Sequence, residues 1–314
     1  MILVTGASGF VGRALLCHLA AQGNAVRAAY RNDAVSPPAG VQSVSVGDLG
    51  SKQDWGAALQ AVNVVVHAAA RVHIMKDVAI DPLLVYRKVN VDGTLNLATQ
   101  AAAAGVRRFI FLSSVKVHGE STAEGGAFRA DKEPIPVDSY GISKLEAERG
   151  LQVIAAQTGM EVVIIRPPLV YGPGVRGNFA ALMHAVVRGI PFPLGAINNR
   201  RSLVALDNLV DLIVTCLDHP KAGNQTFLVC DGEDLSTPDL MLRMAGAMNK
   251  TAYLIPLPIS LMSVIARIFG KSAALQRLCG NLQVDITETV DVLGWKPPID
   301  VDEGLRRAVV QWRK

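Results

Sequence analysis

TGASGFVG, residues 5–12, places glycines at positions 6, 9 and 12 between an apolar run, ILV (2–4), and the helical pattern VGRALLCHLAAQG (11–23). Glycine lets the chain turn tightly and lets the backbone approach a pyrophosphate, which then lies at the positive end of the helix. A merely structural tight turn is the alternative explanation, but a strand directly before the loop and a helix directly after it favour the binding role. The stretch therefore predicts a dinucleotide-binding loop that opens a βαβ unit.

The same alternation continues through the first half of the chain. Short β-branched runs, such as VVIIRPPLV (162–170), alternate with longer helical patterns, such as residues 83–104. This order is typical of a parallel sheet with helices on both faces. Beyond residue 172 glycines and prolines interrupt shorter elements, among which QTFLVCD (225–231) is a clear strand. We expect an α/β protein: a Rossmann-type doubly wound parallel sheet in residues 1–171, and a smaller mixed α/β substrate lobe in 172–314, partly interleaved with the first domain.

Composition and charge exclude several classes of protein. The net charge of +4 is spread over 314 residues without a basic block, which argues against a nucleic-acid partner. The first residues, MILVTGASGF, lack the basic start and apolar core that are typical of a signal peptide. The longest apolar stretch, ISLMSVIARIF (259–269), is shorter than the roughly 20 residues of a spanning helix, so we interpret it as a core helix, with a peripheral membrane contact as the alternative. The four cysteines are scattered without metal-ligand partners. We expect a soluble cytoplasmic protein with no metal and no stable membrane insertion.

The end of the second predicted strand bears on the choice of cofactor. An acidic residue there suits the ribose 2′-hydroxyl of NAD, whereas an arginine suits the 2′-phosphate of NADP. In AAYRND (28–33), Arg31 ends the strand and Asp33 follows two residues later. Arg31 therefore favours NADP(H), with NAD(H) as the alternative. Asp48, in GDL (47–49), is placed to meet the adenine ring.

A second site is predicted where the strand RFIFLSS (108–114) ends in two serines and YGISK (140–144) follows downstream. Tyr140 and Lys144 are four residues apart, so their side chains share one face of a helix. An ammonium beside a phenol lowers the pKa of the phenol, as a proton-transfer catalyst requires. The pair alone is common by chance, but it gains weight from the glycine loop and from Ser113 and Ser114.

Taken together, these motifs resemble those of the extended short-chain dehydrogenase/reductases, in particular the NAD-dependent epimerases and dehydratases of nucleotide sugars. The resemblance extends over nearly the whole chain and includes HAAA (67–70), NVDGT (90–94), RPPLVYGPG (166–174) and RRSLVALDNLVD (200–211). It implies that Ser114 is the catalytic hydroxyl, that Tyr140 is the acid/base, and that Lys144 binds the nicotinamide ribose while tuning Tyr140. The cofactor shell that it implies, besides Tyr140 and Lys144, is Gly6, Ser8, Gly9, Phe10, Val11, Gly12, Arg31, Asp48, Leu49, Ala68, Ala69, Ala70, Asn90 and Pro167.

The resemblance also implies a UDP-sugar substrate and a homodimer. Asn178 and Phe179 match an asparagine–apolar pair over the diphosphate and uridine, and Leu194 matches a residue that lines the uracil pocket. Arg200 matches the phosphate-binding arginine, and its neighbour Arg201 could substitute for it. A fixed guanidinium charge is a natural partner for a diphosphate. Two solvated arginines in a polar loop are the alternative.

The reaction is narrowed by departures from related patterns. Sugar-nucleotide dehydratases carry an Asp-Glu pair after the catalytic hydroxyl, where this chain has Val115 and Lys116, so dehydration is not expected. We interpret Lys116 as a solvated loop charge. UDP-galactose 4-epimerases carry an asparagine where this chain has Leu169, and a tyrosine where it has His118, which we interpret as a packing residue.

Three hypotheses follow. The favoured one is an NADPH-dependent reductase of a UDP-4-keto-6-deoxy-N-acetylhexosamine, serving surface polysaccharide such as O-antigen. The alternative is a UDP-glucose or UDP-N-acetylglucosamine 4-epimerase with tightly bound NAD. The third, a non-catalytic dinucleotide-binding protein, conflicts with the presence of Ser114, Tyr140 and Lys144 together.

Overall fold

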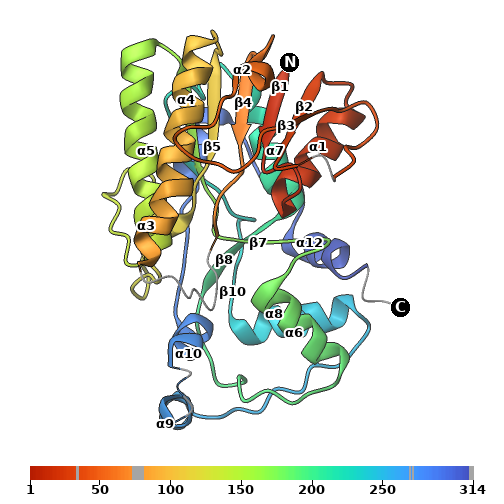
Figure 1. The fold of residues 1–314 in the computed structure, drawn as a ribbon. Coiled ribbons are helices and arrows are strands. Elements are labelled where there is room, and N and C mark those ends of the chain that lie inside the picture. Colours follow the sequence, from red (N-terminus) through yellow and green to blue (C-terminus); the bar gives the residue numbers. More distant parts are fainter. Residues whose placement is uncertain (33–34, 73–80, 269, 271, 311–314) are drawn as a thin grey trace.

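The computed structural model describes residues 1–32, 35–72, 81–268, 270 and 272–310. Its main feature is a seven-stranded sheet in the order β3-β2-β1-β4-β5-β6-β9 (Figure 1). Every neighbouring pair in this sheet is parallel, which confirms the predicted Rossmann-type α/β fold. The strands are β1 (Ile2–Thr5), β2 (Val26–Tyr30), β3 (Gln42–Ser45), β4 (Val64–His67), β5 (Arg108–Leu112), β6 (Glu161–Arg166) and β9 (Thr226–Leu228).

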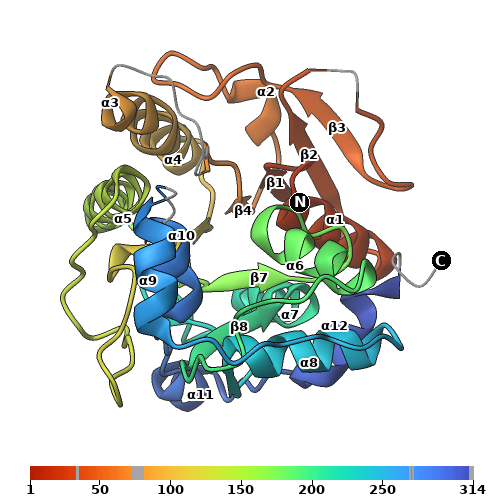
Figure 2. The ribbon, with the colours of Figure 1, turned by 90° about the horizontal axis from the view of Figure 1, so that it is seen from below.

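Helices cover both faces of the sheet (Figure 2), because its inner strands are apolar on both sides. One core contains side chains of α2 (Gly56–Leu59), α4 (Gly93–Ala103) and α5 (Ser139–Thr158). The other contains side chains of α1 (Phe10–Ala21) and α7 (Leu206–Asp218), with Leu293 at the end of α11 (Thr287–Leu293).

The predicted strand at 162–170 is in fact two strands in two different sheets. β6 ends at Arg166, and β7 (Leu169–Tyr171) begins after Pro167 and Pro168. Proline has no N–H to donate to a ladder, so the pair separates the strands. β7 joins β8 (Arg201–Ala205) and β10 (Asp234–Leu235) in a small sheet, which leads the chain out of the large one.

The smaller lobe lies below the large sheet in Figure 1 and has its own core of buried apolar side chains. Two segments beyond residue 171 nevertheless belong to the upper part: α7 packs on α1, and β9 is the edge strand next to β6. The strand predicted at 225–231 is therefore real but shorter, and it lies in the large sheet. The lobe contains α6 (Gly177–Val187), α8 (Thr237–Ala247), α9 (Ile259–Ile268), α10 (Ser272–Cys279) and α12 (Val301–Ala308).

The helical run predicted over 83–104 is regular only at its ends. It consists of α3 (Pro82–Tyr86), a six-residue π-helix η1 (Arg87–Asp92), and α4. Short π segments inside helices are frequent at functional sites. Asn90, which is 1% exposed, lies within this segment.

Candidate active site

The glycine loop fits closely against the end of β4. Gly6 has φ +67°, and a Cβ there would lie 2.7 Å from the backbone of Ala68 and Ala69. A Cβ on Gly12 would lie 2.1 Å from the carbonyl oxygen of Gly6. Both positions therefore require glycine, the first for its conformation and its contact, the second for its contact alone. The structure thus brings the loop and the predicted alanines together.

The loop leads into a helix start that suits an anionic group. Gly9 is the N-cap of α1 and supplies no side chain to cap it. The first amides of a helix have no intrahelical partner and lie at the positive end of the helix dipole. The backbone of Phe10, Val11 and Gly12 is therefore available to a pyrophosphate, with exposed Ser8 beside it. These free backbone amides at the start of α1 fit the pyrophosphate of a dinucleotide.

The two residues predicted to contact the adenosine contact each other. Arg31 Nε lies 3.1 Å from Asp48 Oδ1, and both side chains are strongly exposed. Leu49 lies partly buried, close to Gly93 at the start of α4. Asp33 lies outside the described residues.

The Ser114 loop is held by backbone hydrogen bonds to the neighbouring strand. The N–H of Ser113 donates to Ile165 O at 2.8 Å, and the N–H of Val115 donates to Pro167 O at 2.9 Å. Ser114 then caps a short 3-10 helix, η2 (Val115–Val117), its Oγ accepting from the N–H of Lys116 at 3.2 Å. The hydroxyl is partly exposed at the carboxyl edge of the sheet. Pro167 therefore acts on this site through its carbonyl.

Tyr140 and Lys144 lie on one face of α5, as predicted, and the hydroxyl of Tyr140 lies near that of Ser114. Asp138 is the N-cap of α5, and its Oδ1 accepts from the N–H of Gly141 at 2.6 Å. A Cβ on Gly141 would lie 2.6 Å from the carbonyl oxygen of Lys116. Glycine at this position thus allows the helix to approach the Ser114 loop closely.

The electrostatics differ from the expectation for an isolated YxxxK pair. Burial raises the pKa of Tyr140, and Asp138 and Tyr86 raise it further, while the nearby Ser114 hydroxyl lowers it. Burial lowers the pKa of Lys144 to about 7. Its Nζ donates to Leu112 O at 2.8 Å and lies 4.3 Å from the centroid of the Phe111 ring. The predicted lowering of the Tyr140 pKa by Lys144 is therefore not found in this structure, since the ammonium donates to the carbonyl of Leu112 instead.

Lys116, interpreted from sequence as a solvated loop charge, instead forms ion pairs with Asp138 and Glu120, together called here the clamp. Its Nζ lies 2.5 Å from Asp138 Oδ2 and 2.9 Å from Glu120 Oε1, and its side chain is 27% exposed. Because Asp138 caps the helix of Tyr140, the clamp joins the loop of Ser114 to that helix. The sequence around Lys116 does not indicate this partner, because Asp138 is 22 residues away.

Asn90 joins the same region from the other side. Its Nδ2 donates to Arg71 O and to Ser143 Oγ, both at 3.0 Å, and its Oδ1 accepts from the N–H of Arg71 at 2.8 Å. The hydroxyl of Ser143 donates to Tyr140 O at 2.8 Å. Asn90 thus connects the loop after β4 to the first turn of α5, and sequence reasoning missed Ser143.

A buried ionic network lies beneath the serines. Arg166 donates to both carboxylate oxygens of Glu148, at 3.1 and 2.6 Å, and Ser113 donates to Glu148 as well. His118 accepts from Arg166 at 2.9 Å and stacks on Phe128, which agrees with a packing role. The network fixes the strand end that presents Ser114.

The residues predicted on the substrate side are spread over the smaller lobe. Asn178 is exposed in the first turn of α6, whereas Phe179 stacks on Tyr171 and Leu194 is 4% exposed in the lobe's core. Arg200 is exposed, but Arg201 is partly buried, and its Nη1 donates to Gly280 O at 2.9 Å. Burial lowers the pKa of Arg201, while the charge of Glu120 raises it. Arg201 is therefore the more buried of the two arginines, and it feels the charge of Glu120, which also pairs with Lys116.

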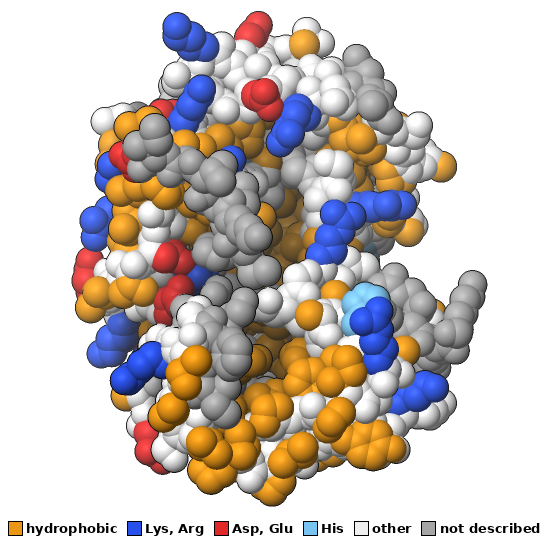
Figure 3. Space-filling model, turned by 60° about the horizontal axis from the view of Figure 1, so that its bottom comes forward, with side chains coloured by type: hydrophobic (Ala, Val, Ile, Leu, Met, Phe, Trp, Pro, Cys, Tyr) orange, Lys and Arg blue, Asp and Glu red, His pale blue; other side chains and the backbone are white. Residues whose placement is uncertain are grey.

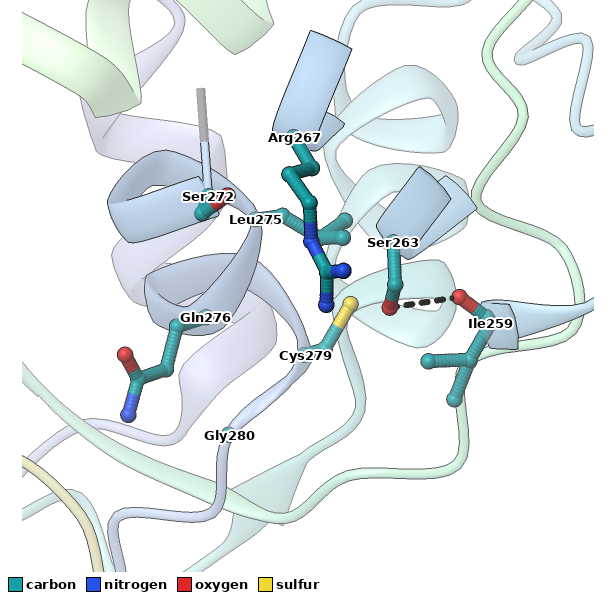
Figure 4. A pocket seen from close by; sticks show the side chains of 8 residues that line it. All are labelled: Ile259, Ser263, Arg267, Ser272, Leu275, Gln276, Cys279 and Gly280. Atoms are coloured by element: carbon teal, nitrogen blue, oxygen red, sulfur yellow. Dashed lines mark hydrogen bonds between the residues drawn. The ribbon is translucent and has the colours of Figure 1, made fainter. Parts of the chain in front are cut away.

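A cavity of about 450 Å³ opens where α10 ends, between α9 and α10 (Figure 4). Arg267 and the hydroxyls of Ser263 and Ser272 contribute to its polar lining. A smaller cavity of about 330 Å³ lies near Asp234 and Asp285. Within the described ranges, no cluster of three or more histidine, cysteine or acidic side chains could hold a metal ion.

Comparisons with known proteins agree with this geometry. The model of the family described as "NAD dependent epimerase/dehydratase family" matches residues 2–230. The chain is 48% identical over 307 residues to the UDP-glucose 4-epimerase of Vibrio cholerae, which covers 98% of this chain and 93% of that protein. It is 29% identical over 322 residues to an N-acetyl-alpha-D-glucosaminyl-diphospho-ditrans,octacis-undecaprenol 4-epimerase of Escherichia coli O157:H7, with 98% and 94% of the two chains covered.

Among solved structures, the chain is similar to MoeE5 in complex with UDP-glucose and NAD. The TM-score is 0.77 at 25% identity, with 99% of this chain and 98% of the other covered. With the family model spanning most of the chain and a relative 48% identical along nearly all of it, the protein belongs to the NAD-dependent epimerase/dehydratase family.

Proposed function

We propose that the protein is a 4-epimerase of a UDP-hexose, with UDP-glucose and UDP-galactose as the first pair to test, and that it works with NAD that stays bound through the cycle. The observation that carries the proposal is the close packing of the start of α5, which bears Tyr140, against the Ser114 loop at the carboxyl edge of the sheet, where a Cβ on Gly141 would lie 2.6 Å from Lys116 O. The full-length similarity to a UDP-glucose 4-epimerase supports the choice of reaction.

In this proposal, bound NAD supplies the hydride acceptor and donor at the sugar carbon. Tyr140 removes the proton from the C4 hydroxyl and returns it to the same oxygen after the sugar has turned, and Ser114 donates a hydrogen bond to that oxygen. Because burial raises its pKa, Tyr140 is a protonated phenol in the ligand-free protein. Lys144 is the cation that would favour its phenolate, once its ammonium moves from the carbonyl of Leu112. General acid–base catalysis of this kind contributes ~10²–10⁴-fold.

NAD is proposed in place of the NADP(H) that Arg31 favoured. The guanidinium of Arg31 pairs with the carboxylate of Asp48, so a 2′-phosphate at this place would meet a negative charge as well as a positive one. The family is described as NAD-dependent, and the similar structure MoeE5 contains NAD. These observations do not support the NADP preference.

The 4-keto reductase, first favoured from sequence, has weaker support than the epimerase. It was favoured by Arg31, by Leu169 and by the stretch SSVKVHGE (113–120), and Arg31 already has a carboxylate partner. Leu169 remains a departure from UDP-galactose epimerases and is 44% exposed at the start of β7. The cofactor content of the purified protein distinguishes the two reactions, because only the epimerase is expected to retain NAD.

A second candidate substrate is a sugar carried on a polyprenyl diphosphate. One of the relatives is named for this reaction, at 29% identity. The observation that favours it is the apolar helix α9, which would suit the lipid chain. α9 is followed by α10 and then by Gly280, whose carbonyl accepts from Arg201, the side chain that would suit the diphosphate. Both substrates share a diphosphate and an epimerisable C4 carbon, so the catalytic residues would serve either.

The test begins with the purified protein. Heat release of about one NAD per chain, together with conversion of UDP-glucose to UDP-galactose without added cofactor, is the expected result. An empty cofactor site that prefers NADPH, with reduction of a UDP-4-keto sugar, would establish the reductase instead. N-acetylglucosaminyl diphosphate carried on a short polyprenol, compared with UDP-N-acetylglucosamine, tests the second candidate. Tyr140→Phe serves as the inactive control in each assay.

A further inference from the structure

We propose that the outer surface of the smaller lobe is a docking surface for an anionic lipid bilayer, on which the protein lies peripherally. The surface is defined by six exposed apolar side chains, called here the apolar face: Ile190, Tyr253, Ile255, Leu261, Val264 and Ile268. Their exposed fractions range from 44% for Ile190 to 74% for Ile268. In Figure 3, hydrophobic side chains gather over this lower part of the molecule.

The apolar face is built from neighbouring segments. Tyr253 and Ile255 lie on a strand-like stretch whose backbone bonds Phe192: the N–H of Phe192 donates to Tyr253 O at 2.8 Å, and the N–H of Ile255 donates to Phe192 O at 2.7 Å. Ile190 lies two residues before Phe192, and the chain continues from Ile255 into α9. The face is therefore continuous along two adjacent segments and the helix that follows them.

α9 is apolar on its inner and outer sides. Met262 and Ala266 are buried and pack inward. Leu261, Val264 and Ile268 are spaced three and four residues apart, so they form one outward stripe, and none is covered in this chain. With ten residues the helix is about 15 Å long, half the thickness of a bilayer core, so it suits a position in the interface and not a span. In the described chain, no helix is long and apolar enough to cross a membrane.

The charge around the apolar face has one sign. Between Asp239 and Asp285 the sequence contains no acidic residue but five basic ones, and between Glu161 and Asp207 it again contains only basic ones. Arg188, Lys250 and Arg267 are exposed near the face, and among the described ion pairs none involves these three. Lysine and arginine beside a band of aliphatic side chains match the headgroups and acyl boundary of an anionic membrane.

A second copy of the chain fits this surface less well. A two-fold interface would place the same patch on both partners, so basic side chains of the two copies would come together without a carboxylate between them. α9 is followed by α10, and a Cβ on Gly280, just after α10, would lie 3.8 Å from Ser121 Cβ in the segment that follows the Ser114 loop. The docking proposal holds for either candidate substrate.

The test is co-sedimentation of the full chain with vesicles of phosphatidylglycerol and phosphatidylcholine in equal parts, against pure phosphatidylcholine, at low and high salt. Binding is expected to the anionic vesicles only, and to weaken with salt. Leu261→Ser with Val264→Ser should weaken partitioning about tenfold or more. Arg267→Gln should weaken it about fivefold.

Val153→Ser is the matched control, because Val153 lies on α5 and its exposed fraction of 53% is close to the 56% of Val264 on α9. It should leave partitioning unchanged, and thermal melting of each variant checks the fold. Two results would overturn the proposal. One is the absence of anionic-vesicle binding by the intact protein. The other is an oligomer that the double serine variant dissociates, which would make the apolar face a contact between copies.

Discussion

At the scale of single residues, the proposed mechanism depends on the approach of Tyr140 to Ser114, two residues 26 positions apart in the sequence. Tyr140→Phe removes the proton that this mechanism moves but keeps the ring that packs edge-on against Tyr86. We expect kcat to fall by ~10²–10⁴-fold while bound NAD and the melting temperature stay as in the parent. Turnover measured alongside cofactor content checks this. Near-normal turnover in the variant would remove Tyr140 from the mechanism.

His118 predicts how stability changes with pH. Burial and the charge of Arg166 lower its pKa from 6.5 to about 4, and its Nε2 must be unprotonated to accept from Arg166. Between pH 6.5 and about 4 the unfolded chain therefore binds a proton that the folded chain does not. The free energy of unfolding is then highest above pH 6.5 and decreases as pH falls through this window, by about 1.4 kcal/mol per pH unit for this one group.

Urea unfolding across that window measures the effect. His118→Gln keeps an acceptor for Arg166 but does not titrate, so its pH dependence should be shallower by roughly that slope. His184→Gln, at an exposed histidine, is the control and should retain the parent slope. Identical slopes for all three proteins would show that His118 is not the titrating group.

At the scale of elements, catalysis depends on how the Ser114 loop meets α5. Lys116→Met keeps the aliphatic stem but removes the charge that holds Asp138 and Glu120. We expect kcat to fall about tenfold with little change in KM, because the variant displaces a catalytic group and leaves the substrate contacts in place. Lys116→Arg should recover part of the loss, and Lys132→Met, at an exposed lysine, should have no effect. An unchanged kcat would reduce the clamp to a surface ion pair.

Gly141 tests the same contact by size. An added methyl would lie 2.6 Å from a backbone oxygen of the loop, which cannot move aside as a flexible side chain can. Gly141→Ala should destabilise the protein by about 1–3 kcal/mol and reduce kcat with it. Gly246→Ala is the matched helical control: its new methyl meets nothing within 4 Å, so it should stabilise slightly. Equal effects at the two positions would show that helix propensity, and not the contact, decides.

Elements with local chemistry were predictable from the sequence. The glycines at 6 and 12, the helix that follows them, and the shared face of Tyr140 and Lys144 depend on short-range spacing, and the structure has them as expected. The division of one apolar run between two sheets was missed, although Pro167 and Pro168 were the signal for it. The clamp of Lys116 and the π segment at Asn90 carry no local signal, because both depend on partners that only the tertiary fold brings near.

At the scale of the whole molecule, one core of the large sheet is built from both halves of the sequence. Val163 and Ile165 of β6 lie in the same buried cluster as Leu209, Ile213 and Phe227, which come from beyond residue 171. β6 is also bonded along its outer edge by β9. We therefore propose that residues 1–171, although they carry the glycine loop and the catalytic residues, are not an independent folding unit.

A fragment of residues 1–171 tests this proposal. Without α7 and β9 it would expose one apolar face of the sheet and an unpaired edge at β6, both of which promote aggregation. We expect it to be insoluble, or to lack a cooperative urea transition and bound NAD, whereas the full chain has both. A fragment that unfolds cooperatively and binds NAD would instead mean that the dinucleotide-binding half folds first, and that α7 and β9 are added to a finished sheet.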